Sequence, residues 1–460
     1  MNEHSHIILG TTASYRTPVP LLQADRRRHV YIIGQTGTGK TGLLLNMMHA
    51  DLLSGGGFCF IDPHGDASRE IAGLAPVQRR ADVIYLDPSD DTHTFAYNPL
   101  AGVAEAQRAT AAANIVSAFK NIWADSWGPR LEYILMNALR LLLDNQDVTL
   151  LALPRLLTDD DFRERLLRNC IDPVIRSFWQ NQYAEYDARF RNEAIAPIQN
   201  KVGTFLSNPF IRSILCQNSS TLDFARLMNE GKVLIVNLSK GNLGPEPAHL
   251  LGALFITAFS QAAEARRHMP EDERRDFTLF VDEFQNFATD SFASILSEAR
   301  KWRLSLVAVS QQVAGQLPDT LRHAIFGNAG TLIVFRVGAL DAEFLAPELG
   351  LLQASTLTTT NNFDAWFKLM RLGTPQQATW MHTLTPPPPG KRFKKVVAFS
   401  RSRHMMPRQP VEERIAAFFP KPKTRRPRRK READTHEPAR QQGAARSSPA
   451  HPAQPRHGAT

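Results

Sequence analysis

A glycine-rich stretch at residues 34–41 constrains the fold of this chain more than any other feature. It reads Gly-Gln-Thr-Gly-Thr-Gly-Lys-Thr and matches the pattern G-x-x-x-x-G-K-[ST] in full. An apolar run at residues 30–33 precedes it, and a segment with helical patterning, residues 40–53, follows it. A buried strand, a phosphate-binding loop and a helix in that order begin an α/β fold with a parallel sheet. The stretch therefore predicts a RecA-like P-loop domain.

This loop has the residues needed to hold a nucleoside triphosphate. Glycines allow a backbone in which successive N–H groups wrap the phosphates, and the positive end of the following helix adds to this attraction. Lys40 is expected to neutralise the β- and γ-phosphates, and the Thr41 hydroxyl to bind Mg²⁺. The predicted cofactors are ATP and Mg²⁺. The predicted nucleotide-binding residues are Gly34, Gln35, Thr36, Gly37, Thr38, Gly39, Lys40, Thr41 and Gly42.

Two acidic residues follow a second apolar run, at residues 277–281. Asp282 and Glu283 come directly after it. Strand carboxyl ends open at the ligand crevice of such a sheet, so we expect Asp282 to hold Mg²⁺. Glu283 is expected to polarise the attacking water as a general base, which favours an ATP hydrolase over a kinase.

Two further polar residues are candidate catalytic groups. Gln311 follows the apolar run 304–309, where a neutral amide can bind both the lytic water and the γ-phosphate. Arg300 ends the helical segment before that run. Two interpretations of Arg300 stay open: an arginine finger that reaches a neighbouring subunit's γ-phosphate, or a solvated cation at a helix end.

Apolar runs recur along the chain and predict further strands. They lie at residues 58–61, 82–86, 233–238 and 331–335, and residues 363–384 alternate enough for one or two edge strands. Between residues 101 and 230 the apolar spacing is helical instead, which predicts an inserted all-α domain; helices packed directly on the sheet remain the alternative. The predicted organisation is a P-loop domain in two parts, residues 1–100 and 231–385, around an insertion at 101–230, with a tail at 386–460.

The predicted tail carries most of the positive charge. From residue 391 onward there are 19 Lys and Arg against 5 Asp and Glu, which leaves residues 1–390 with a net charge of −5. Such a composition buries too little apolar area to offset chain entropy, so we expect most of the tail to be disordered, with one amphipathic stretch at 411–419. The tail is a candidate for binding polyanions or simply a solubilising end.

The rest of the composition predicts a cytoplasmic location. The three cysteines are far apart in the sequence, and no apolar run is long enough to span a bilayer. Any contact with the inner membrane is expected to come through partners.

The ordered set of these motifs resembles the coupling ATPases of type IV secretion and conjugation, the TraG/TraD group within the FtsK/HerA class of DNA translocases. The stretches that carry the resemblance are residues 26–41, 60–66, 233–244, 280–287, 299–312 and 327–338. It implies a homo-hexameric ring that drives DNA through a central channel, with a relaxase or relaxosome and secretion-channel proteins as partners. It also places Gln311 as a nucleotide-sensing glutamine and Arg300 as a trans-acting arginine. Asp62 matches a family element near the site, although forming the turn before Pro63 explains it equally well.

Three functions therefore follow as expectations. The first is a hexameric Mg-ATP-hydrolysing motor that translocates DNA, single- or double-stranded, in conjugative transfer. The second is an ATP-switched recruitment module that binds DNA or a relaxosome protein through the basic tail. The third is a HerA-like DNA-processing translocase. An ATPase that translocates protein instead of DNA stays open as well.

Overall fold

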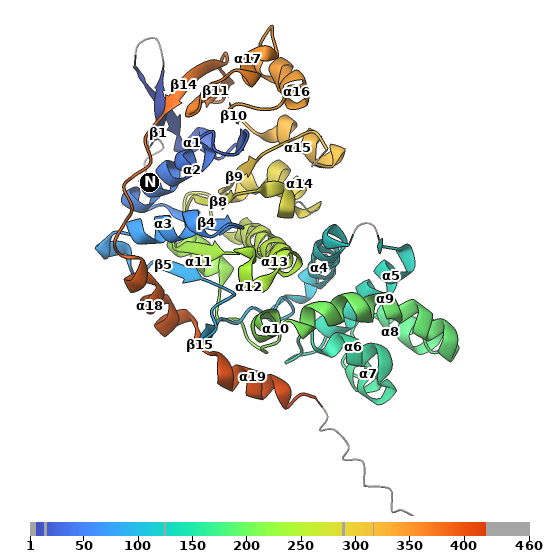
Figure 1. Ribbon diagram of the computed structural model, residues 1–460. Coiled ribbons are helices and arrows are strands. Elements are labelled where there is room, and N and C mark those ends of the chain that lie inside the picture. Colours follow the sequence, from blue (N-terminus) through green and yellow to red (C-terminus); the bar gives the residue numbers. More distant parts are fainter. Residues whose placement is uncertain (1–5, 13–15, 124–125, 288–289, 316, 420–460) are drawn as a thin grey trace, which may run out of the picture. The chain divides into compact units, whose positions relative to one another are not determined.

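The computed structural model (Figure 1) describes residues 6–12, 16–123, 126–287, 290–315 and 317–419. Residues Met1–Phe418 form one compact unit. Its centre is an 11-stranded sheet with the order β2-β1-β14-β11-β10-β3-β9-β8-β4-β7-β5. Its strands are β1 His6–Thr12, β2 Pro18–Leu22, β3 Val30–Ile33, β4 Gly57–Asp62, β5 Val83–Leu86, β7 Val233–Asn237, β8 Phe277–Val281, β9 Leu304–Ser310, β10 Thr331–Val334, β11 Asp364–Lys368 and β14 Thr379–Thr383.

The sheet is parallel from β10 to β5 and antiparallel beyond β10. The expected α/β fold with a mostly parallel central sheet is confirmed. Residues 363–384 do form two strands of this sheet, β11 and β14, but the prediction that they lie at its edge is wrong. The hairpin of β1 and β2 extends the sheet past β14, so β11 and β14 lie inside it.

Two layers of helices cover the sheet because successive strand residues point to opposite faces. Val30 and Ile32 pack with helices α2 (Lys40–Ser54), α3 (Asp66–Leu74) and α18 (Phe393–His404). Tyr31 and Ile33 belong to the core on the other face. Figure 1 shows the helices of that face. They are α13 (Pro245–Glu264), α14 (Asp290–Glu298), α15 (Asp319–Asn328) and α16 (Ala339–Leu349).

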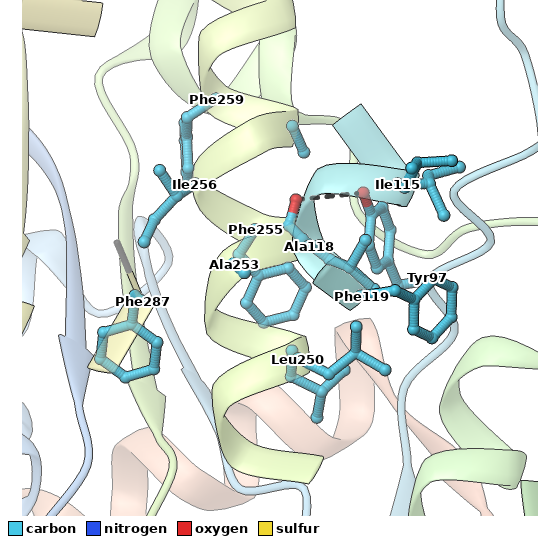
Figure 2. Close-up of a cluster of buried hydrophobic side chains, with 14 of the residues drawn as sticks. Tyr97, Ile115, Ala118, Phe119, Leu250, Ala253, Phe255, Ile256, Phe259 and Phe287 are labelled. Carbon is cyan, nitrogen blue, oxygen red and sulfur yellow. Dashed lines mark hydrogen bonds between the residues drawn. The ribbon is translucent and has the colours of Figure 1, made fainter. Parts of the chain in front are cut away.

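The chain between β6 (His93–Thr94) and β7 is helical and, in its described part, contains no strand. Its helices are α4 Arg108–Ile122, α5 Pro129–Leu143, α6 Ala152–Thr158, α7 Asp160–Leu167, α8 Pro173–Ser177, α9 Ala188–Ser207, α10 Pro209–Leu215 and α11 Phe224–Glu230. Figure 2 shows α4 side chains, among them Phe119, beside α13 side chains such as Phe255. The Tyr97 hydroxyl donates a hydrogen bond to the Leu254 carbonyl over 3.3 Å.

These helical residues share one buried cluster with a face of the sheet. The boundaries of a separate inserted domain at 101 and 230 therefore stay a prediction, as does the boundary at 385.

The predicted disorder of the tail is wrong for residues 393–410, whereas the amphipathic stretch expected at 411–419 lies largely in a helix. Together they form α18, the short strand β15 (Met406–Pro407) and α19 (Arg408–Ala416). Val396 is 1% exposed, and the Ser400 hydroxyl accepts a hydrogen bond from the Tyr85 N–H of the edge strand β5. The overall composition of the tail gave no sign of α18, because the buried face of a helix needs only a few apolar residues at helical spacing. Most of the predicted tail, residues 420–460, lies outside the described residues.

Candidate functional site

The phosphate loop joins the carboxyl end of β3 to the first turn of α2, as its sequence predicts. Gly37 and Gly39 have φ of 77° and 120°, which residues with a Cβ rarely adopt. At Gly34 the limit is space, since a Cβ there would lie 2.5 Å from the Phe335 Cβ. The loop backbone therefore depends on glycine at these positions.

Several donors of this loop are open to an anion. Within the described chain, none of the N–H groups of Thr36 to Lys40 donates to a protein acceptor. Lys40 Nζ donates to the carbonyl oxygens of Gly34 over 2.6 Å and of Gln35 over 3.0 Å. Burial lowers the pKa of Lys40, and the nearby charges of Asp282 and Glu283 partly oppose that shift. Unsatisfied N–H groups, a helix N-terminus and a lysine fit the phosphates of a nucleotide.

Asp282 lies at the carboxyl end of β8 and is 6% exposed. Burial, followed by the charges of Glu283 and Asp62, raises its pKa to about 6. A carboxylate in such surroundings is suited to a cation. Together with the exposed Thr41 hydroxyl it offers two oxygen ligands, and no group of three His, Cys, Asp or Glu in the described residues forms a full metal cage. Mg²⁺ fits this pattern because it takes few protein ligands and completes its shell with water and phosphate oxygens.

Glu283 is constrained in both its backbone and its carboxylate. Its φ of 48° is uncommon for a residue other than glycine. Gln285 Nε2 donates to Glu283 Oε2 over 2.5 Å, Gln311 Nε2 donates to Oε1, and His64 Nε2 lies 3.6 Å from the same Oε1. The structure thus brings Gln311 to Glu283 across the adjacent strands β8 and β9. A carboxylate fixed by two amides can take a proton from a water molecule held in a defined place.

Two of these contacts were not predicted from the sequence. His64 comes two residues after the end of β4, and Gln285 two residues after Glu283. Polar residues just beyond a strand end are the signal that could have found them. Asp62 acts differently: its carboxylate accepts the N–H groups of His64 over 2.9 Å and Ser68 over 2.8 Å. It therefore shapes the turn into α3, one of the two interpretations left open for it.

Arg300 lies away from this group. It is exposed and sits in the 3-10 helix Ala299–Trp302, directly before β9 begins. Its charge acts on His29, which precedes the amino end of β3, whereas the phosphate loop follows the carboxyl end of that strand. Arg300 thus lies near the amino ends of the parallel strands, whereas Lys40 of the same chain lies beyond their carboxyl ends.

No helix in the described ranges is both long and apolar enough to cross a membrane.

A comparison with known protein families finds a match over most of the chain. Residues 14–362 match the type IV secretion-system coupling protein DNA-binding domain. The Type 4 coupling protein DotL of Legionella pneumophila is 20% identical over 349 residues, which cover 63% of this chain and 44% of DotL. The chain therefore spans less than half the length of this relative.

Solved structures with the same fold include bacterial conjugative coupling proteins. Unbound TrwBΔN70 aligns with a TM-score of 0.59 at 16% identity, covering 85% of this chain and 96% of that one. TrwB in complex with a non-hydrolysable ATP analogue, ADPNP, gives 0.61 at 17% identity over 85% and 92% of the two chains. VirB4 of Thermoanaerobacter pseudethanolicus gives 0.56 at 15% identity, over 84% and 98%. At these identities the likeness establishes the fold.

Proposed function

The chain belongs to the family of the type IV secretion-system coupling protein DNA-binding domain, and on that premise we propose that it is a Mg-ATP-hydrolysing motor that engages and translocates DNA as a homo-hexamer in conjugative transfer. Its partners in this proposal are DNA, a relaxase or relaxosome, and proteins of the secretion channel. It works in the cytoplasm, and contact with the inner membrane is made through those partners.

The arrangement around Glu283 is the observation that carries the proposal. A buried carboxylate held by Gln285 and Gln311 stands beside Asp282 and within electrostatic reach of Lys40. A kinase transfers its phosphoryl group to a substrate hydroxyl and has no need of a base for water. Hydrolysis needs one, and the contacts of the Glu283 carboxylate support that role for it.

In this proposal, different residues of the chain bind the phosphates, accept the proton and position the base. The N–H groups of the loop and Lys40 hold the phosphates, so the γ-phosphate faces Glu283. Glu283 accepts the proton of the attacking water, and Gln311 keeps the carboxylate in place. Mg²⁺ held by Thr41 and Asp282 would neutralise charge that develops on the phosphate oxygens. Gln311 also connects the state of Glu283 to β9, at whose other end Arg300 lies.

Two substitutions test the hydrolysis step. Glu283→Gln keeps the shape but removes the base, so we expect kcat to fall about 10²-fold or more with ATP binding retained. Lys40→Ala is expected to weaken ATP binding itself. ATP turnover and nucleotide affinity should both be measured, with Lys201→Ala, in the helical segment, as the control for loss of a lysine. Full activity in Glu283→Gln would contradict the assigned base.

DNA as the load is tested separately. Wild-type ATPase activity is expected to rise when single- or double-stranded DNA is added, as a motor that engages DNA requires. The named relatives support this choice, since TrwB is a bacterial conjugative coupling protein. ATPase activity that responds to neither form of DNA would count against translocation while leaving hydrolysis intact.

A recruitment module is the second candidate, because residues 421–431 hold eight Lys and Arg and no acid. Such a run contacts nucleic-acid phosphates without sequence preference and in a salt-dependent way. The test is a chain that ends at residue 419, since α18 and α19 belong to the compact body. Loss of DNA binding with intact basal ATPase favours recruitment through the tail. Retained stimulation by DNA assigns the tail an accessory role.

A further inference from the structure

An exposed aromatic ring lies beside the phosphate loop, and hydrolysis makes no use of it. Phe363 is 48% exposed and directly precedes β11. Its φ of 67° is a costly conformation for a bulky residue. Backbone strain of this kind persists only where the surrounding structure enforces it, and it is common at ligand sites.

Hydrogen bonds hold Phe363 in that conformation and tie it to the loop. Its N–H donates to the carbonyl of Thr38 over 2.7 Å. Its own carbonyl accepts the N–H of Thr383 over 2.9 Å and the Thr383 hydroxyl over 3.0 Å. A Cβ placed on Gly39 would lie 3.1 Å from Phe363 Cδ1, so the ring edge contacts the loop. The backbone of Phe363 is therefore fixed, and its ring contacts the loop while it stays open to solvent.

The chain after β14 continues this apolar surface next to the first turn of α2. Leu384 is 37% exposed, and its carbonyl accepts Asn46 Nδ2 over 2.8 Å. A Cβ on Gly42 would lie 2.9 Å from Pro386 Cγ. Phe363, Leu384 and Pro386 together are called the base shelf below.

The strand order determines whether the nucleoside or the γ-phosphate of a bound nucleotide lies near the base shelf. Glu283 and Gln311 follow β8 and β9, on one side of β3, whereas β10 and β11 lie on the other side. A γ-phosphate that faces Glu283 leaves the α-phosphate and the nucleoside directed toward β10 and β11. The base shelf stands on that side of the loop.

We propose that the base shelf, with Phe363 as its main ring, stacks against the purine base of the bound nucleoside triphosphate. This inference rests on the proposed function, because it requires the phosphates to occupy the loop. Stacking recognises the face of a base and tolerates differences at its edge, so adenine and guanine are both accepted. Leu384 and Pro386 add apolar area to the same face and no side-chain hydrogen-bond donor.

Calorimetric titration of the full chain tests the shelf, with ATP, GTP and inorganic tripolyphosphate as the probes. Phe363→Ala is expected to raise the Kd of ATP and of GTP about 10-fold and to leave the Kd of tripolyphosphate unchanged. Phe363→Tyr keeps a stacking ring, so we expect it to bind ATP within about two-fold of the wild type. Trp380→Ala is the matched control, because Trp380 is an exposed aromatic residue on β14, 39% exposed, outside the shelf.

Three outcomes would contradict the proposal that the base shelf stacks on the purine. One is an unchanged ATP affinity in Phe363→Ala. Another is an equal loss of ATP and tripolyphosphate affinity, which would mean that Phe363 only shapes the loop. The third is a wild type that binds ATP no more tightly than tripolyphosphate; the phosphate site would then stand without a base site. Because the readout is binding, a chain that shows these shifts but hydrolyses no ATP would contradict the proposed ATPase and leave the shelf intact.

Discussion

His29 is held in its neutral form by the residues around it. Its ring is 2% exposed, and its Nδ1 accepts the Leu306 N–H over 3.0 Å, so this nitrogen carries no proton. Burial, aided by the charge of Arg300, lowers the pKa of His29 from 6.5 to about 4. The pKa of His29 therefore reports on the charge of Arg300 in the same chain.

The depressed pKa of His29 predicts a loss of stability in acid. As the pH falls from 6.5 toward 4, the unfolded chain takes up a proton at this residue and the folded chain does not. The free energy of unfolding should drop by about 3 kcal/mol across that window from His29 alone. His29→Asn keeps an acceptor and tolerates the positive φ, so its urea unfolding should show a smaller drop than the wild type. If the free energy of unfolding fell equally with pH in the two proteins, His29 would not be the source of the acid sensitivity.

Single residues of the site were predictable when their role depends on position along the chain. Lys40, Thr41, Asp282, Glu283 and Gln311 each follow a strand, and strand ends can be read from apolar runs. The partners of Glu283 were harder to find, because Gln285 and His64 reach it through turns whose shape no local pattern gives. Phe363 was missed for the same reason, since it meets the loop only through the pairing of β11 with β10 and β14.

Among the secondary-structure elements, α18 shows how the C-terminal segment supports the body. Phe393 packs edge-to-face on Tyr85 with ring centroids 5.1 Å apart, and Val396 is buried against the same face of the sheet. Arg408, at the start of α19, donates to the carbonyl of Asp90 and to the Ser213 hydroxyl. α18 thereby covers the side of the sheet where the edge strand β5 lies.

Two truncations measure this support. A chain that ends at residue 390 loses α18, exposes apolar area of β5 and α3, and should melt about 5 °C lower or more. A chain that ends at residue 419 keeps both helices and should melt with the full chain. Thermal unfolding followed by circular dichroism compares them. Equal melting points for all three proteins would show that α18 adds nothing to stability.

Elements were predictable from the sequence where burial on both faces gives a continuous apolar run. β3, β4, β7, β8 and β9 are of this kind, and every residue of these strands is buried. β1 and β2 were not found: β1 lacks a clear alternation, and two of the five residues of β2 are prolines, which are rare inside strands. α18 was hidden by a basic composition that describes the tail as a whole and not its buried face.

For the whole molecule, the positions of Arg300 and the phosphate loop restrict how Arg300 can act in hydrolysis. Within one chain Arg300 lies near the amino end of β9, and the phosphate loop follows the carboxyl end of the neighbouring strand β3. An Arg300 that acts in hydrolysis must therefore do so in the next subunit of a ring. The structure of one chain leaves the solvated-cation interpretation open, and a subunit-mixing experiment decides between them.

Mixed rings should recover activity that neither variant has alone. Lys40→Ala subunits still supply Arg300, and Arg300→Ala subunits still supply an intact loop. In a closed ring mixed at random from equal amounts, about a quarter of the interfaces pair an intact loop with an intact Arg300. ATPase activity should therefore rise to about a quarter of the wild-type level. Lys40→Ala mixed with Glu283→Gln is the control, because both changes damage the same side of the interface. No recovery in mixtures that do assemble would leave Arg300 as a surface cation.

The strand order of the sheet also affects how the chain can fold during its synthesis. β3, which leads into the phosphate loop, pairs with β9 and β10, and the hairpin of β1 and β2 joins the rest of the sheet through β14 at residues 379–383. The ribosome must therefore make most of the compact unit before β3 and the β1–β2 hairpin can take their places in the sheet. Until then the apolar runs of β3 and β4 stay exposed on the nascent chain, and such long-range parallel pairing folds slowly. We therefore expect the nascent chain to need chaperones during translation, because its nucleotide site is assembled from segments far apart in the sequence.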